Sequence, residues 1–519
     1  MNNKREHVTS SEIMERLEVV GRVFSEDGTY RPNELTFTLI EGRSITLGEI
    51  VCIKHPKLEN TYVFYQVIDI PLRRKVKVYE EDLVRVNQPI EDPERNYPRA
   101  YAIQIGYIDP SSNEVKPLLE HIKPLCEVYR PTPQMIEKLL RPRSDRVYVS
   151  VGKIYPKLEN ELYLDLNVLL RQGLLIIGGV GTGKTTTMIT MIITVLEECI
   201  KNNLKPHLLI IDKDGEYGCE ELKSTAELAG GYICIPVDKV GFVETFTNPD
   251  ALHKRLLEVT GIHPSSKLAR ELKSIVQQIF VNNRVVKLSE ELFQEIMSKV
   301  HPGLKNELRG RLKVAKEVLL EISPTIEYSI DDVIELISNK AVVHIDCSTA
   351  ETWDQVLRVI ASLLDSIYVR ALQDKSFGCL IVIDEVHFYA PEKGMFKPAS
   401  EALHERMRNT LIGKIATTGA RNGVVLFVTT QRLSLVAKTL STQVGQNLIV
   451  HRVEDVDLER LKEIAGSELV GAIRLLPRGY ALVKATANPM GRPMIVKMYP
   501  KARPLSTATT CLSRWRGNV

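Results

Sequence analysis

The chain has little of what marks secreted or zinc-binding proteins. Its eight cysteines contain no C-x-x-C pair and several lie inside apolar runs. Zinc sites and disulfide frameworks are therefore not indicated, and we interpret the cysteines as thiols of a reducing cytoplasm. They stand at positions 52, 126, 199, 219, 234, 347, 379 and 511.

Long apolar runs and a strong net charge are also missing. The longest apolar run, residues 188–196, is interrupted by threonines, and residues 1–18 are mostly polar and charged. Neither resembles a membrane span or a signal peptide, so we expect a cytoplasmic protein. The net charge of +3 at pH 7 neither requires nor excludes a nucleic-acid partner, because a basic channel can be offset by acidic outer faces.

The most informative stretch is residues 178–185, which read Gly-Gly-Val-Gly-Thr-Gly-Lys-Thr and match the P-loop pattern in full. An apolar strand precedes this stretch and a long helix follows it, so backbone N–H groups face a phosphate. Lys184 is expected to reach the β- and γ-phosphates of ATP, and Thr185 to ligate Mg²⁺. The predicted nucleotide-binding residues are Gly178, Gly179, Val180, Gly181, Thr182, Gly183, Lys184, Thr185, Thr186 and Asp384.

A second nucleotide signature follows the apolar strand at residues 379–383, which ends in Asp384-Glu385. This is a Walker B pattern. Asp384 is expected to hold Mg²⁺ through water, and Glu385 to orient or deprotonate the attacking water. A solvated strand end is the alternative for such a pair taken alone, but its combination with a P-loop favours catalysis.

Two further strands deliver polar groups. The strand at 424–428 runs into Thr429-Thr-Gln431-Arg432, and Gln431 is the predicted sensor of the γ-phosphate. The strand at 208–211 is followed by Asp212, Glu216 and Tyr217. Asp212 and Glu216 either support the nucleotide site or act at a subunit boundary. The alternative is that they only cap a turn.

At 519 residues the chain is expected to form two or three domains. Short β-type runs between about 19 and 129 predict a small β-barrel. Later runs alternate with helices and predict a mostly parallel sheet, so the fold class is α/β, a RecA-like P-loop ATPase core. We divide the chain into an N-terminal β-barrel with linker at 1–145, the first part of the core at 146–246, a helical insertion at 247–332, the second part at 333–502 and a tail at 503–519.

These elements together resemble the HerA ATPases of the HerA and FtsK superfamily. The resemblance covers most of residues 15–500. It rests on the barrel, Val-Gly-Lys-Ile at 151–154 before Leu-Asp-Leu-Asn at 164–167, the P-loop, 212–217, the helical insertion, Asp-Glu-Val-His at 384–387 and Thr-Gln-Arg at 430–432. It implies a homohexameric DNA translocase or helicase with ATP sites at subunit boundaries and DNA in the channel. It also implies DNA end processing, in the archaeal branch with a nuclease partner of the NurA type on the barrel.

One element departs from the family pattern. The usual Glu-Gly-Arg-[Lys or Arg] stretch corresponds here to residues 415–423, with Thr418 at the acidic position and Ala420 at the arginine position. The family arginine is the transition-state cation donated by a neighbouring subunit, and such a guanidinium contributes about 10³–10⁵ in rate. The candidates here are Arg421, Lys414 and Arg452, of which we favour Arg421.

DNA contacts are less defined, because a solvated surface charge is the better explanation of each candidate after the Walker B strand taken alone, and only the set suggests phosphate contacts. The candidates are Lys393, Lys397, Arg406 and Arg408 after the Walker B strand, Arg73, Arg74, Lys75 and Lys77 in the barrel, and the basic helix at 305–316. We predict an ATP-driven DNA motor. Its rivals are a motor of a conjugative or DNA-import secretion system and an ATP-dependent assembly switch for a partner protein.

Overall fold

The computed structural model describes residues 17–25, 29–74, 96–143, 145–241, 245–246, 248–283, 286–319, 326–392, 401–466 and 470–505. The chain divides into two compact units, each built from segments far apart in the sequence. The first unit comprises residues 1–169, 174–195 and 445–500, and the second comprises 170–173, 196–444 and 501–519.

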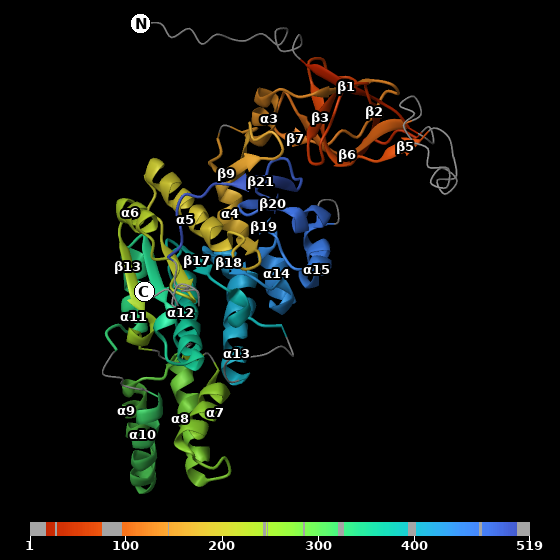
Figure 1. The fold of residues 1–519 in the computed structure, drawn as a ribbon. Coiled ribbons are helices and arrows are strands. Elements are labelled where there is room, and N and C mark those ends of the chain that lie inside the picture. The colour runs from red at the N-terminus through yellow and green to blue at the C-terminus, as the bar shows by residue number, and fades with distance from the viewer. Residues whose placement is uncertain are drawn as a thin grey trace, which may run out of the picture. The chain divides into compact units, whose positions relative to one another are not determined.

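The N-terminal part of the first unit is a closed β-barrel, as predicted (Figure 1). The strand order is β2-β1-β8-β3-β4-β6, and a β2–β6 pairing closes it. The bounds are β1 Glu18–Val23, β2 Glu34–Leu39, β3 Ile50–Lys54, β4 Tyr62–Asp69, β6 Asn96–Ile108 and β8 Glu127–Arg130, with β5 Leu72–Arg74 and β7 Val115–Lys116 also paired to β6. Alternate residues such as Val63, Tyr65 and Val67 fill the interior, as the two-residue period of a strand requires.

A short helix follows the barrel where the sequence suggested only a Pro-rich joint. This helix, α3, spans Pro133–Leu140, and the Thr132 hydroxyl caps it by accepting the N–H of Met135 at 3.3 Å. Proline suits the first helical position because its fixed φ is helical and it has no N–H to leave unpaired.

The first unit also contains a sheet in the order β10-β9-β21-β20-β19-β11. The bounds are β9 Tyr148–Ile154, β10 Glu161–Asp165, β11 Leu174–Ile177, β19 Asn447–Val450, β20 Tyr480–Ala485 and β21 Met494–Met498. Only β11 and β19 pair in parallel in this part; the other neighbours are antiparallel. The sequence analysis did not identify β20 and β21, which lie close enough in the chain to pair as antiparallel neighbours without a crossover helix.

The second unit contains a parallel sheet in the order β18-β17-β12-β16-β13. The bounds are β12 Leu208–Asp212, β13 Tyr232–Pro236, β16 Val342–Asp346, β17 Cys379–Ile383 and β18 Val424–Thr430. Strands β12, β17 and β18 are buried along their whole length, as expected where helices cover both faces. The carboxyl ends of these strands meet at one edge, where open α/β sheets bind ligands.

Helices connect the strands. They are α4 Leu166–Gln172, α5 Lys184–Lys201, α6 Glu220–Ala229, α11 Ile330–Asn339, α12 Trp353–Gln373, α13 Glu401–Arg408, α14 Lys438–Val444 and α15 Asp455–Ala465. A π-helix, η5, spans Asn409–Ala416 directly after α13, and a 3₁₀ turn, η6, spans Gly419–Asn422.

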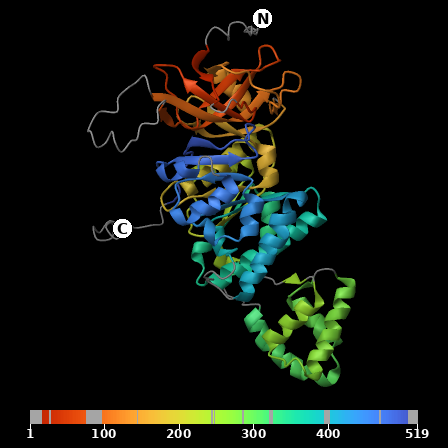
Figure 2. The ribbon, with the colours of Figure 1, turned by 90° about the vertical axis from the view of Figure 1, so that its right-hand side faces the viewer.

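The predicted helical insertion is present in the second unit (Figure 2). Its helices are α7 Pro249–Thr260, α8 Lys267–Asn282, α9 Glu290–Lys299 and α10 Lys305–Leu319. They enclose a hydrophobic core of their own that includes Leu272, Phe293, Ile296 and Leu308. Serine caps begin α8 and α9, because Ser266 and Ser289 accept backbone N–H groups of the first turns.

Among the described residues, no helix is both long and apolar enough to cross a membrane. The described cysteines are free thiols, and all but Cys126 and Cys234 are buried. The predictions made for Lys75, Lys77, Lys393, Lys397 and most of the tail, from residue 506 on, lie outside the described residues.

Candidate nucleotide site

The P-loop of the first unit joins the buried strand β11 to helix α5, which begins at Lys184. Gly181 and Gly183 have φ values of +71° and +111°, which side chains disfavour. Gly178 is constrained by space instead, since a Cβ there would lie 2.7 Å from the Thr182 hydroxyl and 2.8 Å from the Cβ of His451. Glycine is therefore required at 181 and 183 by the backbone angle and at 178 by the lack of space.

Backbone hydrogen bonds hold the loop in place. The N–H of Gly179 donates to the carbonyl of Arg452 at 2.9 Å, and the Thr182 hydroxyl donates to the carbonyl of Gly179 at 2.8 Å. Lys184 is buried at the start of α5, whereas Val180 at the loop tip is 83% exposed. The arrangement presents a helix N-terminus and an ammonium group, the two features that bind phosphate.

His451, directly after β19, contacts the helix that follows the P-loop. Nothing in the sequence was a reason to select this residue. Its Nδ1 lies 3.0 Å from the carbonyl of Tyr480, and its Nε2 lies 2.9 Å from the hydroxyl of Thr187 in α5. Because a carbonyl only accepts, Nδ1 carries the proton and Nε2 accepts from Thr187. Burial lowers the pKa of His451 to about 4. The hydrogen bond to the Tyr480 carbonyl raises this pKa and the charge of Lys184 lowers it, but both effects are smaller than that of burial. A neutral ring thus sits beside the lysine.

Asp384, in the second unit, is a buried carboxylate at the end of β17. Its Oδ1 accepts the hydroxyl of Thr429 at 2.5 Å and the hydroxyl of Tyr217 at 3.2 Å. Thr429 belongs to β18 and Tyr217 to the loop after β12. Side chains from both neighbouring elements therefore orient this carboxylate, as the shared sheet edge predicts.

Glu385 has an unusual backbone, with φ +50° and ψ 54°. Non-glycine residues in this left-handed region cost energy and persist only where surrounding contacts enforce them. The N–H of Glu385 donates to the Thr429 hydroxyl at 3.0 Å, and its Oε2 accepts the N–H of Gln431 at 3.0 Å. The side chain is buried, so the Glu385 carboxylate lies within the protein beside the residues that follow β18.

His387 supplies a second contact to Glu385, with Nδ1 at 3.3 Å from Oε2. The same Nδ1 lies 3.1 Å from the Thr430 hydroxyl, which donates its own proton to the carbonyl of Arg432. The Thr430 oxygen is therefore an acceptor for His387, which assigns a proton to Nδ1. That N–H is positioned to donate to Glu385 as well.

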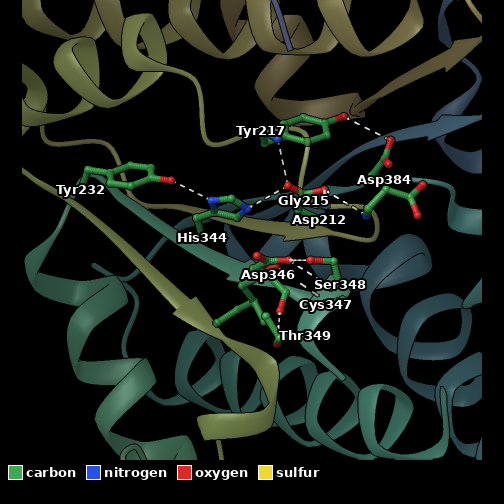
Figure 3. A network of polar contacts seen from close by, with 12 residues as sticks. Asp212, Gly215, Tyr217, Tyr232, His344, Asp346, Cys347, Ser348, Thr349 and Asp384 are labelled. Atoms are coloured by element: carbon green, nitrogen blue, oxygen red, sulfur yellow. Dashed lines mark hydrogen bonds and ion pairs between the residues drawn. The ribbon is translucent and has the colours of Figure 1, made fainter. Parts of the chain in front are cut away.

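Gln431 is the predicted γ-phosphate sensor, and the structure shows its backbone N–H on Glu385. A sensory role for its side chain stays a prediction. Asp212 caps the turn that follows β12, because its carboxylate accepts the N–H groups of Gly215 and Tyr217, each at 2.9 Å (Figure 3). That turn also carries Tyr217 to Asp384. The carbonyl of Glu216 accepts the N–H of Leu505 from the tail at 2.9 Å.

The three candidates for the trans cation differ in their surroundings. The Lys414 ammonium, on the π-helix, lies 2.7 Å from Oδ1 of buried Asp365 on α12. Arg421, in η6, and Arg452, which follows β19, are both exposed. Thr418, at the position where the family has an acid, accepts from the Tyr368 hydroxyl at 2.8 Å while donating to the carbonyl of Lys414 at 2.7 Å.

Of the candidate DNA contacts within the described residues, Arg406 is directed toward α12, where its Nη2 lies 3.2 Å from the Ser362 hydroxyl. Arg408 ends α13. In the described part of the chain no three His, Cys, Asp or Glu side chains gather as a metal site.

Part of the chain matches a described protein family. Residues 149–367 match the family model described as "Helicase HerA, central domain". The matched segment is therefore similar to the central domain of HerA. The segment contains the P-loop and Asp212, whereas Asp384 and Gln431 lie beyond the matched residues.

The chain is also similar to a curated protein, the DNA double-strand break repair helicase HerA of Sulfurisphaera tokodaii. It is 23% identical over 371 residues, which cover 67% of this chain and 69% of the relative. Solved structures that match include VirB4 of Thermoanaerobacter pseudethanolicus, 14% identical with a TM-score of 0.42, covering 68% of this chain and 96% of that one. The bacterial conjugative coupling protein TrwB, 15% identical with a TM-score of 0.38, covers 73% of this chain and 94% of its own.

Proposed function

We propose that this chain is an ATP-dependent DNA translocase or helicase of the HerA type. In this proposal the P-loop binds ATP, and the Asp384-Glu385 pair contributes to its hydrolysis. Lys184 binds the β- and γ-phosphates, and the N–H groups at the start of α5 complete the phosphate cradle. The observation that carries the proposal is the enforced conformation of Glu385, whose buried carboxylate is held by Gln431 and His387.

Glu385 acts as the general base in this proposal. Its carboxylate orients the attacking water and accepts its proton, for which an ionised and positioned oxygen is needed. The contacts from the Gln431 N–H and from His387 keep the carboxylate in one place. Strain in the Glu385 backbone is consistent with a residue retained for function.

The donors present fit Mg²⁺, a hard cation that prefers oxygen. The hydroxyl of Thr185 and the carboxylate of Asp384 would hold it, and when bound it neutralises charge on the phosphates. Thr429 and Tyr217 fix the orientation of the Asp384 carboxylate through Oδ1. The positive φ of Gly181 and Gly183 shapes the loop whose backbone N–H groups would face the triphosphate.

The oligomeric ring, the DNA substrate and the partner protein are proposed from similarity to known proteins. They are supported by the HerA family match and by the curated relative, whose name states a role in double-strand break repair. We propose a cytoplasmic homohexamer that encircles DNA, works in DNA end processing and uses a nuclease partner of the NurA type. The trans cation in this proposal is Arg421. Lys414 is paired with Asp365. Arg452, although exposed like Arg421, lies against the P-loop of its own chain through the bond from the Gly179 N–H to its carbonyl.

The decisive experiment measures ATP hydrolysis with and without linear duplex DNA, together with the mass of the assembled particle. The proposal expects DNA-stimulated hydrolysis by a particle with the mass of a hexamer. Hydrolysis that is indifferent to DNA would contradict the translocase and favour the assembly switch. A monomer at working concentration would contradict any role for a residue donated in trans.

A further inference from the structure

A buried charged pair lies behind the Asp384 site in the second unit. The Nε2 of His344 on β16 lies 3.0 Å from Oδ2 of Asp212 on β12, and the side chains are 2% and 0% exposed. Buried charges are costly unless they are paired and hydrogen-bonded. Asp212 meets this condition, since its carboxylate also accepts the N–H groups of Gly215 and Tyr217.

The other side of the His344 ring faces the strand β13. Its Nδ1 lies 2.7 Å from the hydroxyl of Tyr232, and Cys234 is its register partner on that strand. Burial alone lowers the pKa of His344, but the bond to Asp212 and the neighbouring Cys234 outweigh burial and raise it to about 9. The ring is therefore an imidazolium near neutral pH, and it donates from both nitrogens.

The ionisable groups around this pair come from several elements. Those facing His344 are Asp212 on β12 and Tyr232 and Cys234 on β13, and those near Asp212 on its other side are Tyr217, Cys347 and Tyr389. Burial raises the pKa of Tyr217, Cys347 and Tyr389, so all three stay protonated and neutral. Of these groups, only the His344 imidazolium brings a positive charge to Asp212.

Tyr217 connects the pair to the nucleotide site (Figure 3). Its N–H donates to Oδ2 of Asp212 at 2.9 Å, and its hydroxyl donates to Oδ1 of Asp384 at 3.2 Å. The side chain is fully buried, so the ring has no freedom to swing away. The position of the hydroxyl on Asp384 is consequently determined by the turn that Asp212 holds.

We propose that His344 is a positioning residue for ATP hydrolysis, acting through Asp212 and the Tyr217 hydroxyl on the carboxylate of Asp384. The inference rests on the proposed function, in which Asp384 contributes to the ATP site. Without the imidazolium, Asp212 is a buried carboxylate, and its neighbour Tyr217 also faces the charges of Asp384 and Glu385. The turn then loses its fixed conformation, and Tyr217 no longer holds Asp384 in one orientation.

The test compares the pH profile of kcat for ATP hydrolysis in the wild-type chain, His344→Gln and Tyr217→Phe. His344→Gln should lower kcat about tenfold or more with little change in the KM for ATP, since Lys184 and the P-loop are untouched. In the wild type kcat should fall as the pH rises through about 9, where His344 loses its proton, and this alkaline limb should be absent in His344→Gln. A role limited to packing would not create that difference in the pH profile.

Two further variants make the test decisive. Tyr217→Phe keeps the ring and removes only the hydroxyl, so it should fold and lower kcat about threefold to tenfold even if His344→Gln fails to fold. His253→Gln, which alters a half-buried histidine of the helical insertion, should leave kcat and its pH profile unchanged. Wild-type kcat in Tyr217→Phe, or an unchanged alkaline limb in folded His344→Gln, would overturn the inference. A wild-type chain that does not hydrolyse ATP would instead overturn the proposed function.

Discussion

The hydroxyl of Thr429 lies 2.5 Å from Oδ1 of Asp384 and accepts the N–H of Glu385 at 3.0 Å. One hydroxyl group on β18 therefore holds both Asp384 and Glu385, the two residues that follow β17. Threonine can do this because its hydroxyl donates one hydrogen bond while accepting others. The pairing of β17 with β18 in parallel register, with Ile383 opposite Val428, brings the three residues together.

Replacing Thr429 with valine keeps the shape of the side chain and removes the hydroxyl. We expect Thr429→Val to lower ATP turnover at least about tenfold and the free energy of unfolding by about 1–3 kcal/mol, because the Glu385 N–H is left buried without its partner. Steady-state hydrolysis and denaturant unfolding measure the two effects. Thr417→Val, at an exposed helical threonine, is the matched control. Wild-type turnover in Thr429→Val would contradict the role of this hydroxyl.

Glu385→Gln tests the assignment of the general base. The amide cannot accept the proton of water, so we expect kcat to fall about 10²–10⁴-fold while ATP still binds and is retained on the protein. Nucleotide retention is measured by equilibrium binding and turnover by phosphate release. Glu159→Gln, at an exposed glutamate of the first unit, serves as the control. Normal hydrolysis by Glu385→Gln would show that another group is the base.

Arg421→Ala and Lys414→Ala should separate a catalytic from a structural cation. We expect Arg421→Ala to reduce kcat by about 10³ or more without changing stability, because an exposed guanidinium is free to act in a neighbouring site. Lys414→Ala should lower the unfolding midpoint, since buried Asp365 loses its ion pair. Thermal unfolding and hydrolysis assays on both variants check this. Full activity in Arg421→Ala would redirect the search to Arg452.

His451 should make the first unit sensitive to acid. Its folded-state pKa of about 4 is below the ordinary value of 6.5, so the unfolded chain binds this proton first as the pH falls. Stability from this group is therefore complete above pH 6.5 and is lost progressively toward pH 4, by up to about 3 kcal/mol.

The measurement for His451 is the unfolding midpoint as a function of pH in the wild-type chain and in His451→Gln. The variant should show a shallower loss of stability between about pH 6.5 and 4, because it has no proton to bind there. His253→Gln should follow the wild-type curve. Parallel curves for the wild type and His451→Gln would contradict a neutral buried ring.

Local pattern determined much of this protein. The full P-loop motif located the turn between β11 and α5, with its positive-φ glycines and its lysine at the helix start. Apolar runs of strand length located β12, β16, β17 and β18, since buried parallel strands are continuous in hydrophobicity. Turn-separated β runs predicted the barrel, and charged amphipathic segments predicted the helical insertion.

Tertiary structure decided which polar side chains support the acidic pair. Nothing local to His344, His387 or His451 distinguishes them, because their partners are remote in the chain and are reached only through strand pairing and turns. The left-handed backbone of Glu385 and the contact from Tyr217 to Asp384 likewise depend on packing. The sequence specified the chemical groups and their order, whereas the pairing of strands specified their distances, since hydrogen bonds depend on geometry that spacing along the chain does not contain.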